Sequence, residues 1–129
     1  MLSTVASKIR HIAVCCAALA ALTYGSSVAL AAPEPALAPG NQVADLAQQY
    51  VGSRYAWGGS SPSGFDCTGF VMYVFNQFGV SLPHNEAGQL ASGDRVSADD
   101  LQPGDVLVFA NTYRAGLSHT GIYVGNGEF

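Results

Sequence analysis

Apolar residues recur every three or four positions in two segments of the chain, which is the spacing of a helix that buries one face. The first segment is residues 41–50, and it is followed by Gly52, a residue typical of the position just past a helix end. The second is residues 67–78, with Asp66 at the N-cap position and Gly79 after the last turn. We therefore predict two helices, of which the second, with its wider apolar face, is the core helix.

Short apolar runs predict strands nearer the C-terminus. Residues 106–110 are rich in valine and follow a tight turn at residues 101–105, and residues 119–124 form a second run. The Asn-Gly pair at residues 126–127 is typical of a hairpin turn, which requires a returning strand. Because only two residues remain after that pair, we expect the chain to end before this strand.

Two further segments lie between the predicted helices and strands. Residues 53–64 are dense in glycine and serine and carry Tyr55 and Trp57, so we expect a loop with an aromatic cluster. Residues 84–90 are polar and follow a Leu-Pro pair, and we expect a short helix or a turn there. Neither segment is predicted to contain a strand.

The N-terminal residues have the pattern of a secretory signal peptide. Lys8 and Arg10 precede an apolar run at residues 12–22 that is too short for a membrane-spanning helix, and residues 28–31 supply an Ala-x-Ala cleavage site. We therefore expect residues 1–31 to be removed on export, which places the protein in the cell envelope or outside the cell without a stable membrane association. A retained signal anchor is the alternative interpretation.

The residues left after that cleavage bound the protein's size and partners. Residues 32–40 read as a linker rich in proline and alanine, and residues 41–129 are enough for one small domain. Together they contain no lysine and three arginines against nine acidic residues, a balance that repels phosphate backbones and argues against nucleic acid as a partner. With Cys67 as their one cysteine they cannot form an internal disulfide, and they match no common metal-ligand spacing, so we expect neither a metal nor an organic cofactor.

Cys67 is the candidate nucleophile. It follows the capping Asp66 and opens the second predicted helix, where unpaired backbone N–H groups and the helix dipole lower a thiol pKa and could also stabilise an oxyanion. A buried structural thiol is the alternative. His119 begins a strand and is better placed to act as a base than His84, which reads more simply as a surface histidine at a turn. Taken alone, His119 also fits a half-buried strand histidine.

Four segments stand in an order that resembles the NlpC-type cell-wall peptidase family, a compact branch of the papain-like cysteine peptidases. They read YAWGG, FDCTGFV, LQPGDV and HTGIYVG, at residues 55–59, 65–71, 101–106 and 119–125. The resemblance extends from about residue 43 to residue 129. It implies a papain-like α+β fold in which the helix that carries Cys67 packs on a small antiparallel sheet that carries His119.

The same resemblance implies roles for five residues. Cys67 matches the nucleophile and His119 the base. Tyr55 matches a tyrosine that helps to hold the oxyanion or the substrate, and Asp66 matches a residue that caps the helix and meets a free amino group of the substrate. Thr68 stands where the family usually has serine, which keeps the hydroxyl but adds a methyl group at the substrate wall. The polar residue that orients the base lies on the returning strand in the family, so we expect it beyond the end of this chain.

The activity implied for the complete domain is hydrolysis of peptidoglycan stem peptides between γ-linked D-glutamate and a diamino acid. We expect the complete domain to be an exported thiol endopeptidase and a monomer. Attack by Cys67 would give an acyl-enzyme, with His119 protonating the leaving amine. Two alternatives stay open: an amidase that cuts between glycan and stem peptide with the same dyad, and a wall-binding module without turnover. His84 stands where the family usually has arginine, so the polar contact that this arginine makes in the family is not predicted for this chain.

Overall fold

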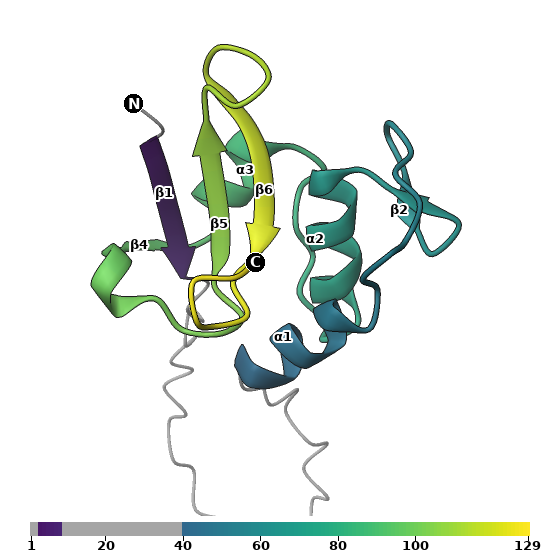
Figure 1. Ribbon diagram of the computed structural model, residues 1–129, viewed down its shortest axis with the longest axis horizontal. Helices are drawn as coiled ribbons and strands as arrows, with labels where there is room; N and C mark the ends of the chain where they lie inside the picture. Colours follow the sequence, from purple (N-terminus) through teal and green to yellow (C-terminus); the bar gives the residue numbers. More distant parts are fainter. Residues whose placement is uncertain (1–2, 9–39) are drawn as a thin grey trace, which may run out of the picture.

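The computed structural model describes residues 3–8 and 40–129 of the chain. In these residues, the α-helices are α1 (Gly40–Gln48), α2 (Cys67–Asn76) and α3 (Glu86–Ala91). The helices α2 and α3 pack against an antiparallel sheet, and α1 packs against α2 (Figure 1). None of the helices in the described part of the chain is long and apolar enough to cross a membrane.

The helices form where the sequence pattern predicts them. α1 and α2 each end two residues earlier than the apolar spacing suggests, and both are followed by a turn. Gly52 and Gly79 lie past these turns with φ angles of 87° and 74°, a left-handed conformation that a helix cannot continue through. The short polar helix is α3, and the side chain of Asn85 caps it by accepting a hydrogen bond from Gly88 N–H at 2.7 Å.

The main sheet has the strand order β4-β1-β5-β6, and its neighbouring strands are antiparallel. Its strands are β1 (Ser3–Lys8), β4 (Asp94–Val96), β5 (Val106–Ala110) and β6 (Leu117–Ile122). β5 has the predicted bounds, and β6 lies two residues nearer the N-terminus than predicted. A smaller sheet pairs β2 (Ser60–Ser61) with β3 (Gly64–Phe65). All of it except Phe65 lies in residues 53–64, for which the sequence predicts a loop.

β1 lies in the segment that the sequence assigns to the charged start of a signal peptide. Its backbone pairs with β5 on one side and with β4 on the other, a strand that the residue pattern does not predict. The apolar run at residues 12–22, the cleavage site at residues 28–31 and residues 32–39 of the predicted linker lie outside the described residues. The signal peptide therefore stays a prediction.

The hairpin turn predicted from the Asn-Gly pair is confirmed. Asn126 and Gly127 have φ angles of 54° and 80°, the two positive values of a type I′ turn, and a β-bridge closes the turn. Past the turn, the ring of Phe129 approaches β6 so closely that a Cβ atom on Gly121 would lie 2.6 Å from it. The turn thus brings the chain back onto β6, at a position where glycine leaves the necessary room.

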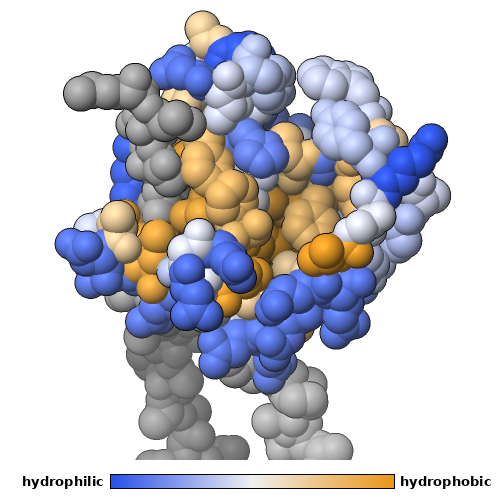
Figure 2. Space-filling model, viewed as in Figure 1, coloured by the Kyte–Doolittle hydropathy of each residue, from blue (hydrophilic) through white to orange (hydrophobic). Residues whose placement is uncertain are grey.

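The core lies between the helices and the main sheet. Its buried apolar cluster comprises Val43, Ala47, Val71, Val74, Phe75, Leu82, Val106, Val108 and Ile122. α2 supplies three of these residues, so it is the core helix that the sequence predicts. Burying an aliphatic or aromatic side chain of this size favours folding by roughly 1.5–3 kcal/mol, so the cluster holds α2 against β5 and β6. Figure 2 shows further apolar surface in the hollow between the sheet and the helices.

Candidate active site

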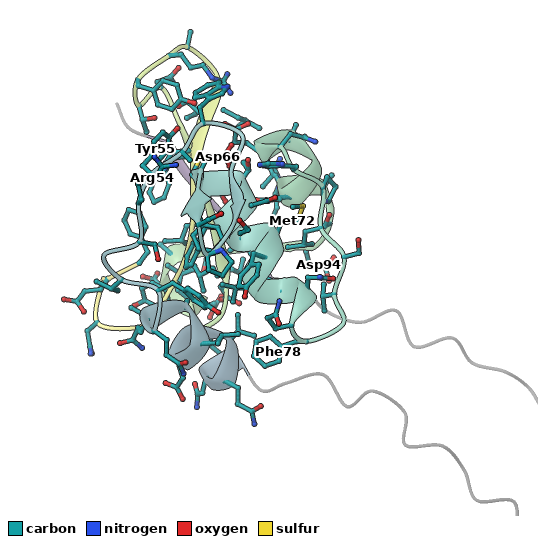
Figure 3. The ribbon with its side chains drawn as sticks, turned by 90° about the vertical axis from the view of Figure 1, so that its right-hand side faces the viewer. Arg54, Tyr55, Asp66, Met72, Phe78 and Asp94 are labelled. Carbon is teal, nitrogen blue, oxygen red and sulfur yellow. The ribbon has the colours of Figure 1, made fainter. Side chains whose placement is uncertain are left out.

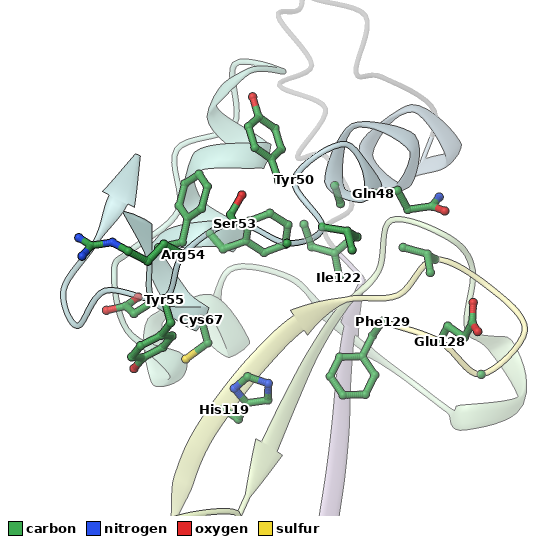
Figure 4. Close-up of a pocket in the computed structure, with 18 residues that line it drawn as sticks. Gln48, Tyr50, Ser53, Arg54, Tyr55, Cys67, His119, Ile122, Glu128 and Phe129 are labelled. Atoms are coloured by element: carbon green, nitrogen blue, oxygen red, sulfur yellow. The ribbon is translucent and has the colours of Figure 1, made fainter. Parts of the chain in front are cut away.

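Cys67 is the first residue of α2, and His119 lies in the middle of β6. Because α2 packs against β6, both side chains reach the same cavity, and Figure 4 shows the Cys67 thiol and the His119 ring pointing towards each other. This larger cavity has a volume of about 670 Å³. Its apolar wall includes Tyr50, Val51, Phe65, Phe70, Ile122, Val124 and Phe129. The structure therefore brings together the two residues that the sequence predicts as nucleophile and base.

A β-bulge lies directly before His119. Phe109 of β5 pairs with His119, whereas the next residue, Ala110, pairs with Leu117, so that Ser118 is the extra residue of β6. Ser118 is buried, and its hydroxyl is hydrogen-bonded to the loop between β5 and β6. Since a bulge bends its strand and redirects the neighbouring side chains, this one helps to set the direction in which His119 leaves the sheet.

Aromatic contacts hold the His119 ring. It stacks on Phe109 with ring centres 5.8 Å apart and meets Phe129 edge-on at 6.2 Å. Burial lowers the pKa of His119, and the Glu86 carboxylate opposes this shift only in part. The imidazole is therefore neutral at neutral pH, which is the form that can accept a proton.

The Cys67 thiol is half-buried, and its pKa departs from the sequence-based expectation. Burial raises the pKa of Cys67, and the carboxylates of Asp66 and Glu86 act in the same direction. Backbone hydrogen bonds from Thr120 and Thr68 oppose the shift without reversing it. The expectation of a lowered thiol pKa is thus wrong for this structure, because desolvation outweighs the backbone donors near the start of α2. The resting pair is a thiol beside a neutral imidazole.

Asp66 connects the start of α2 to two neighbouring segments. Its Oδ1 accepts hydrogen bonds from Gly69 N–H at 2.7 Å and from the Thr68 hydroxyl at 3.0 Å, which confirms it as the cap of α2. Its Oδ2 accepts a hydrogen bond from Gly58 N–H at 2.9 Å. Burial alone would raise the pKa of Asp66, but hydrogen bonds from Gly69, His84 and Thr68 outweigh it and lower the pKa. Asp66 is therefore a carboxylate at neutral pH.

The structure places His84 at an exposed bend, with its ring against Asp66. The Nε2 atom of His84 lies 3.0 Å from Asp66 Oδ1, and 33% of its side chain is exposed. The prediction of a surface histidine at a turn is therefore confirmed, and the contact with Asp66 adds to it. The sequence feature that could have indicated this contact is the position of His84 after the Leu-Pro pair, where the family resemblance implies an arginine. The histidine keeps a polar contact to the carboxylate that precedes Cys67.

A second, smaller cavity of about 310 Å³ also reaches Cys67. Its lining comprises Tyr55, Trp57, Gly58, Asp66, Cys67, Thr68, His84, Glu86, Tyr113 and Arg114. The three residues predicted to contact substrate, Tyr55, Asp66 and Thr68, are thus all in its wall. Thr68 is itself buried, and its hydroxyl is already used by Asp66, so little of it is left for a ligand.

Tyr55 lines both cavities and is 63% exposed. Figure 3 shows it close to Asp66 beside the start of α2. Desolvation raises the pKa of Tyr55, and the neighbouring Cys67 and Asp66 add to that shift. The phenol therefore keeps its proton and is available as a hydrogen-bond donor next to the thiol.

The loop between β5 and β6 contributes two residues that the sequence does not single out. Arg114 forms an ion pair with Glu86 at 3.0 Å, and its guanidinium group lies 5.8 Å from the centre of the Tyr113 ring. Since Glu86 opens α3, this pair links the loop to α3 at the rim of the smaller cavity. The two partners are far apart in the sequence, and no local pattern predicts their contact.

The two cavities offer a thiol, an imidazole, a phenol and carboxylates. In the part of the chain that the structure describes, no three His, Cys, Asp or Glu side chains group closely enough to hold a metal ion. A half-buried thiol beside a neutral imidazole suits nucleophilic catalysis, in which the base takes the thiol proton as sulfur attacks a carbonyl carbon.

Comparison with known proteins agrees with this chemistry. Residues 52–129 match a sequence model described as the NlpC/P60 family. The chain is 49% identical over 89 residues to a gamma-DL-glutamyl hydrolase of Bacillus subtilis (strain 168), which covers 67% of this chain and 22% of that relative. It is 49% identical over 82 residues to a probable endopeptidase p60 of Listeria seeligeri, which covers 64% of this chain and 15% of that relative. The chain thus spans about a fifth or less of the length of these relatives.

A solved structure supports the fold. The crystal structure of the NlpC/p60 domain of the peptidoglycan hydrolase SagA is similar to this chain, with a TM-score of 0.62 and 34% sequence identity. The similarity covers 70% of this chain and 76% of that chain. It confirms the predicted α+β fold, in which Cys67 opens a helix that packs on a small antiparallel sheet.

Proposed function

The chain belongs to the NlpC/P60 family, and on that basis we propose that it is the peptidase domain of an exported cysteine endopeptidase that hydrolyses peptidoglycan stem peptides. The observation that carries the proposal is the meeting of Cys67 and His119 at one cavity. The proposed scissile bond joins γ-linked D-glutamate to a diamino acid. The names of the relatives support it, since one is a gamma-DL-glutamyl hydrolase and another a probable endopeptidase.

The electrostatics of the pair suggest the order of proton transfers. The pKa of Cys67 is raised and that of His119 is lowered, so the thiol keeps its proton until it attacks. As the sulfur–carbon bond forms and the carbonyl electrons move to oxygen, His119 takes the thiol proton. Backbone N–H groups at the start of α2 and the Tyr55 phenol are the proposed hydrogen-bond donors to the oxyanion.

The second half of the reaction returns both residues to their resting state. When the carbon–nitrogen bond breaks, His119 gives its proton to the leaving amine, and a thioester remains on Cys67. His119 then takes a proton from water as the water attacks the thioester carbonyl. The carbon–sulfur bond breaks, the proton returns to sulfur, and the acyl part leaves as a carboxylic acid.

The charge in the wall of the smaller cavity favours a substrate with a free amino group. Asp66 is ionised and lines this cavity next to the nucleophile. Its Oδ1 is surrounded by Gly69, Thr68 and His84. Within residues 3–8 and 40–129, its Oδ2 accepts a single hydrogen bond, from Gly58, so Oδ2 has capacity for a further donor. An ammonium group at the N-terminus of a stem peptide has the matching charge.

Digestion of purified peptidoglycan and of free stem peptides by the full chain tests the proposal. An endopeptidase splits the stem peptides, so mass spectrometry should find fragments that end at D-glutamate. Release of entire stems would identify an amidase instead, and binding without any release would identify a wall-binding module.

Cys67→Ala is the first predicted variant and the control for that digestion. It removes the thiol but leaves the Asp66 cap and the apolar face of α2 untouched, so the fold should persist while fragment release disappears. The circular dichroism spectrum and the melting temperature check the fold. Release at the wild-type rate by the variant would remove Cys67 from the mechanism.

A further inference from the structure

Gln89 is a fully buried polar side chain between three parts of the fold. It lies on α3 and is 0% exposed. Burying an amide without hydrogen-bond partners is unfavourable, so the partners of Gln89 indicate its structural role. Its Nε2 donates to the carbonyl of Thr68 at 2.8 Å and to that of Pro83 at 3.0 Å. Its Oε1 accepts from the hydroxyl of Thr120 at 3.1 Å.

Two of these partners are the chain neighbours of the reacting residues. Thr68 follows Cys67 at the start of α2, and Thr120 follows His119 on β6. One amide group therefore spans the gap between the helix that carries the thiol and the strand that carries the imidazole. The backbone of Thr120 also lowers the pKa of the Cys67 thiol, so the residue that bonds to Gln89 Oε1 acts on the nucleophile as well.

The third partner extends the same link to the smaller cavity. Pro83 directly precedes His84, whose ring contacts Asp66. α3 also fits closely against this segment, because a Cβ atom on Gly88 would lie 2.6 Å from the side chain of Pro83. Gln89 thus contacts the segments that hold the nucleophile, the base and the partner of the capping carboxylate, and it lines neither of the two cavities.

We propose that Gln89 is a positioning residue that holds the start of α2 in register with β6, so that the Cys67 thiol and the His119 ring meet at a reactive distance. Apolar packing between α2 and the sheet does not specify this register, because it is non-directional. The paired donor and acceptor of a buried amide are directional and fix one relative position. The inference rests on the roles of Cys67 and His119 given under the proposed function.

Two nearly isosteric substitutions in the full chain test the proposal. Gln89→Met keeps the side-chain length but removes both polar ends, and Thr120→Val removes only the hydroxyl that reaches Oε1. Gln77→Met is the matched control, since Gln77 is exposed just past the end of α2 and, among the described residues, its side chain bonds only to the carbonyl of Tyr73. Melting temperatures are measured first, and reactivity is then compared at a temperature where every variant is folded.

The first readout does not need peptide cleavage. The rate of Cys67 alkylation by iodoacetamide is followed from pH 6 to pH 10 by mass spectrometry of the peptide that contains Cys67, which separates it from Cys15 and Cys16. Both variants should shift this pH profile, because they change the position of Cys67 relative to Thr120, whose backbone lowers the thiol pKa. The Gln77→Met profile should match the wild type.

The second readout is the division of the loss between kcat and KM on a stem peptide. A small misplacement of reacting groups can reduce a rate by about 10²-fold, so kcat of Gln89→Met should fall by about 10–100-fold while KM stays within about twofold. The double variant should lose no more than Gln89→Met alone, because both changes break one link.

A lower melting temperature with an unchanged pH profile and an unchanged kcat would show that Gln89 is only structural, and would overturn the proposal. If Gln89→Met does not fold, Thr120→Val decides on the same two readouts. Absence of cleavage by the wild-type chain would count against the proposed function, while the alkylation profiles would still decide whether Gln89 positions Cys67.

Discussion

At the scale of single residues, the pKa shifts of Cys67 and His119 run in opposite directions and keep both groups neutral. Burial is the largest cause in each case, because it disfavours the thiolate and the imidazolium alike. A pre-formed ion pair would need stronger stabilisation of both charges than the described surroundings provide. Proton transfer from sulfur to nitrogen is therefore expected to accompany attack on the substrate.

The pH dependence of Cys67 alkylation in the full chain tests this neutral state. The thiol pKa is raised, so the thiolate becomes abundant only above the ordinary thiol pKa of about 8.5. The rate of alkylation by iodoacetamide, followed on the peptide that contains Cys67, should still be rising at pH 9. A plateau reached near pH 6 would instead reveal a thiolate paired with protonated His119, contrary to this prediction.

The two histidines near the site should differ strongly in their effect on turnover. His119→Ala removes the proposed base, and loss of a general base commonly slows a reaction by about 10²–10⁴-fold. His84→Ala removes one of several partners of Asp66 and should mainly raise KM for the peptide. The measurement is kcat and KM of both variants on one stem peptide. The reverse ranking of the two kcat values would assign the base to His84.

The residues of the site divide by the kind of information that locates them. Cys67, His119 and Asp66 stand in sequence segments that resemble a known family, and the structure brings them together as expected. Gln89 and the contact of His84 with Asp66 depend on tertiary packing between segments many residues apart. A polar residue in a short helix gives no local sign of whether it faces water or a buried carbonyl group.

At the scale of secondary structure, elements with a clear apolar period or a specific turn are the ones that the sequence predicts. α1, α2, β5 and the turn at residues 126–127 belong to this class. β2 and β3 have two residues each, which is too short to show a period. β4 has two exposed residues out of three and pairs in the structure with β1, so its pattern carries no alternation that marks a buried face.

The cap of α2 should contribute measurably to stability. Asp66→Ala removes the acceptor for Gly69 N–H, and loss of a capping side chain typically lowers the free energy of unfolding by about 0.5–2 kcal/mol. Because the pKa of Asp66 is lowered in the folded state, its contribution is present above the unfolded pKa of about 3.9 and is lost as pH falls through the folded value. The melting temperature of the variant should therefore differ from the wild type more at pH 7 than at pH 2.

Asn85→Ala is the matched control for this pH dependence. Asn85 caps α3 through a hydrogen bond from Gly88 N–H at 2.7 Å, but its amide does not titrate. Its substitution should lower the melting temperature by similar amounts at both pH values. An equal loss at both pH values for Asp66→Ala would show that the carboxylate charge adds nothing to the cap.

At the scale of the whole molecule, β1 is both a strand of the main sheet and part of the segment that the sequence predicts to be removed. It lies inside the main sheet, between β4 and β5, and pairs with both. The sequence pattern nevertheless predicts that residues 1–31 are removed on export. Removal would take β1 away and leave the backbone groups of β5 that face it without these partners. The precursor and the exported protein would then differ in the main sheet, at β5, which is the strand that pairs with β6 and its His119.

N-terminal sequencing of the chain recovered from the medium of a bacterium that expresses it tests this prediction. We expect the exported protein to begin at Ala32, because the Ala-x-Ala pattern ends at Ala31. Hydrogen exchange then reports on the sheet: β5 amides that pair with β1 should exchange faster in the exported protein than in the full chain held in the cytoplasm, while those that pair with β6 stay protected. An exported protein that still begins at its original N-terminus, with slow exchange across Ser3–Lys8, would instead make β1 a permanent strand of the fold and show that the signal assignment is wrong.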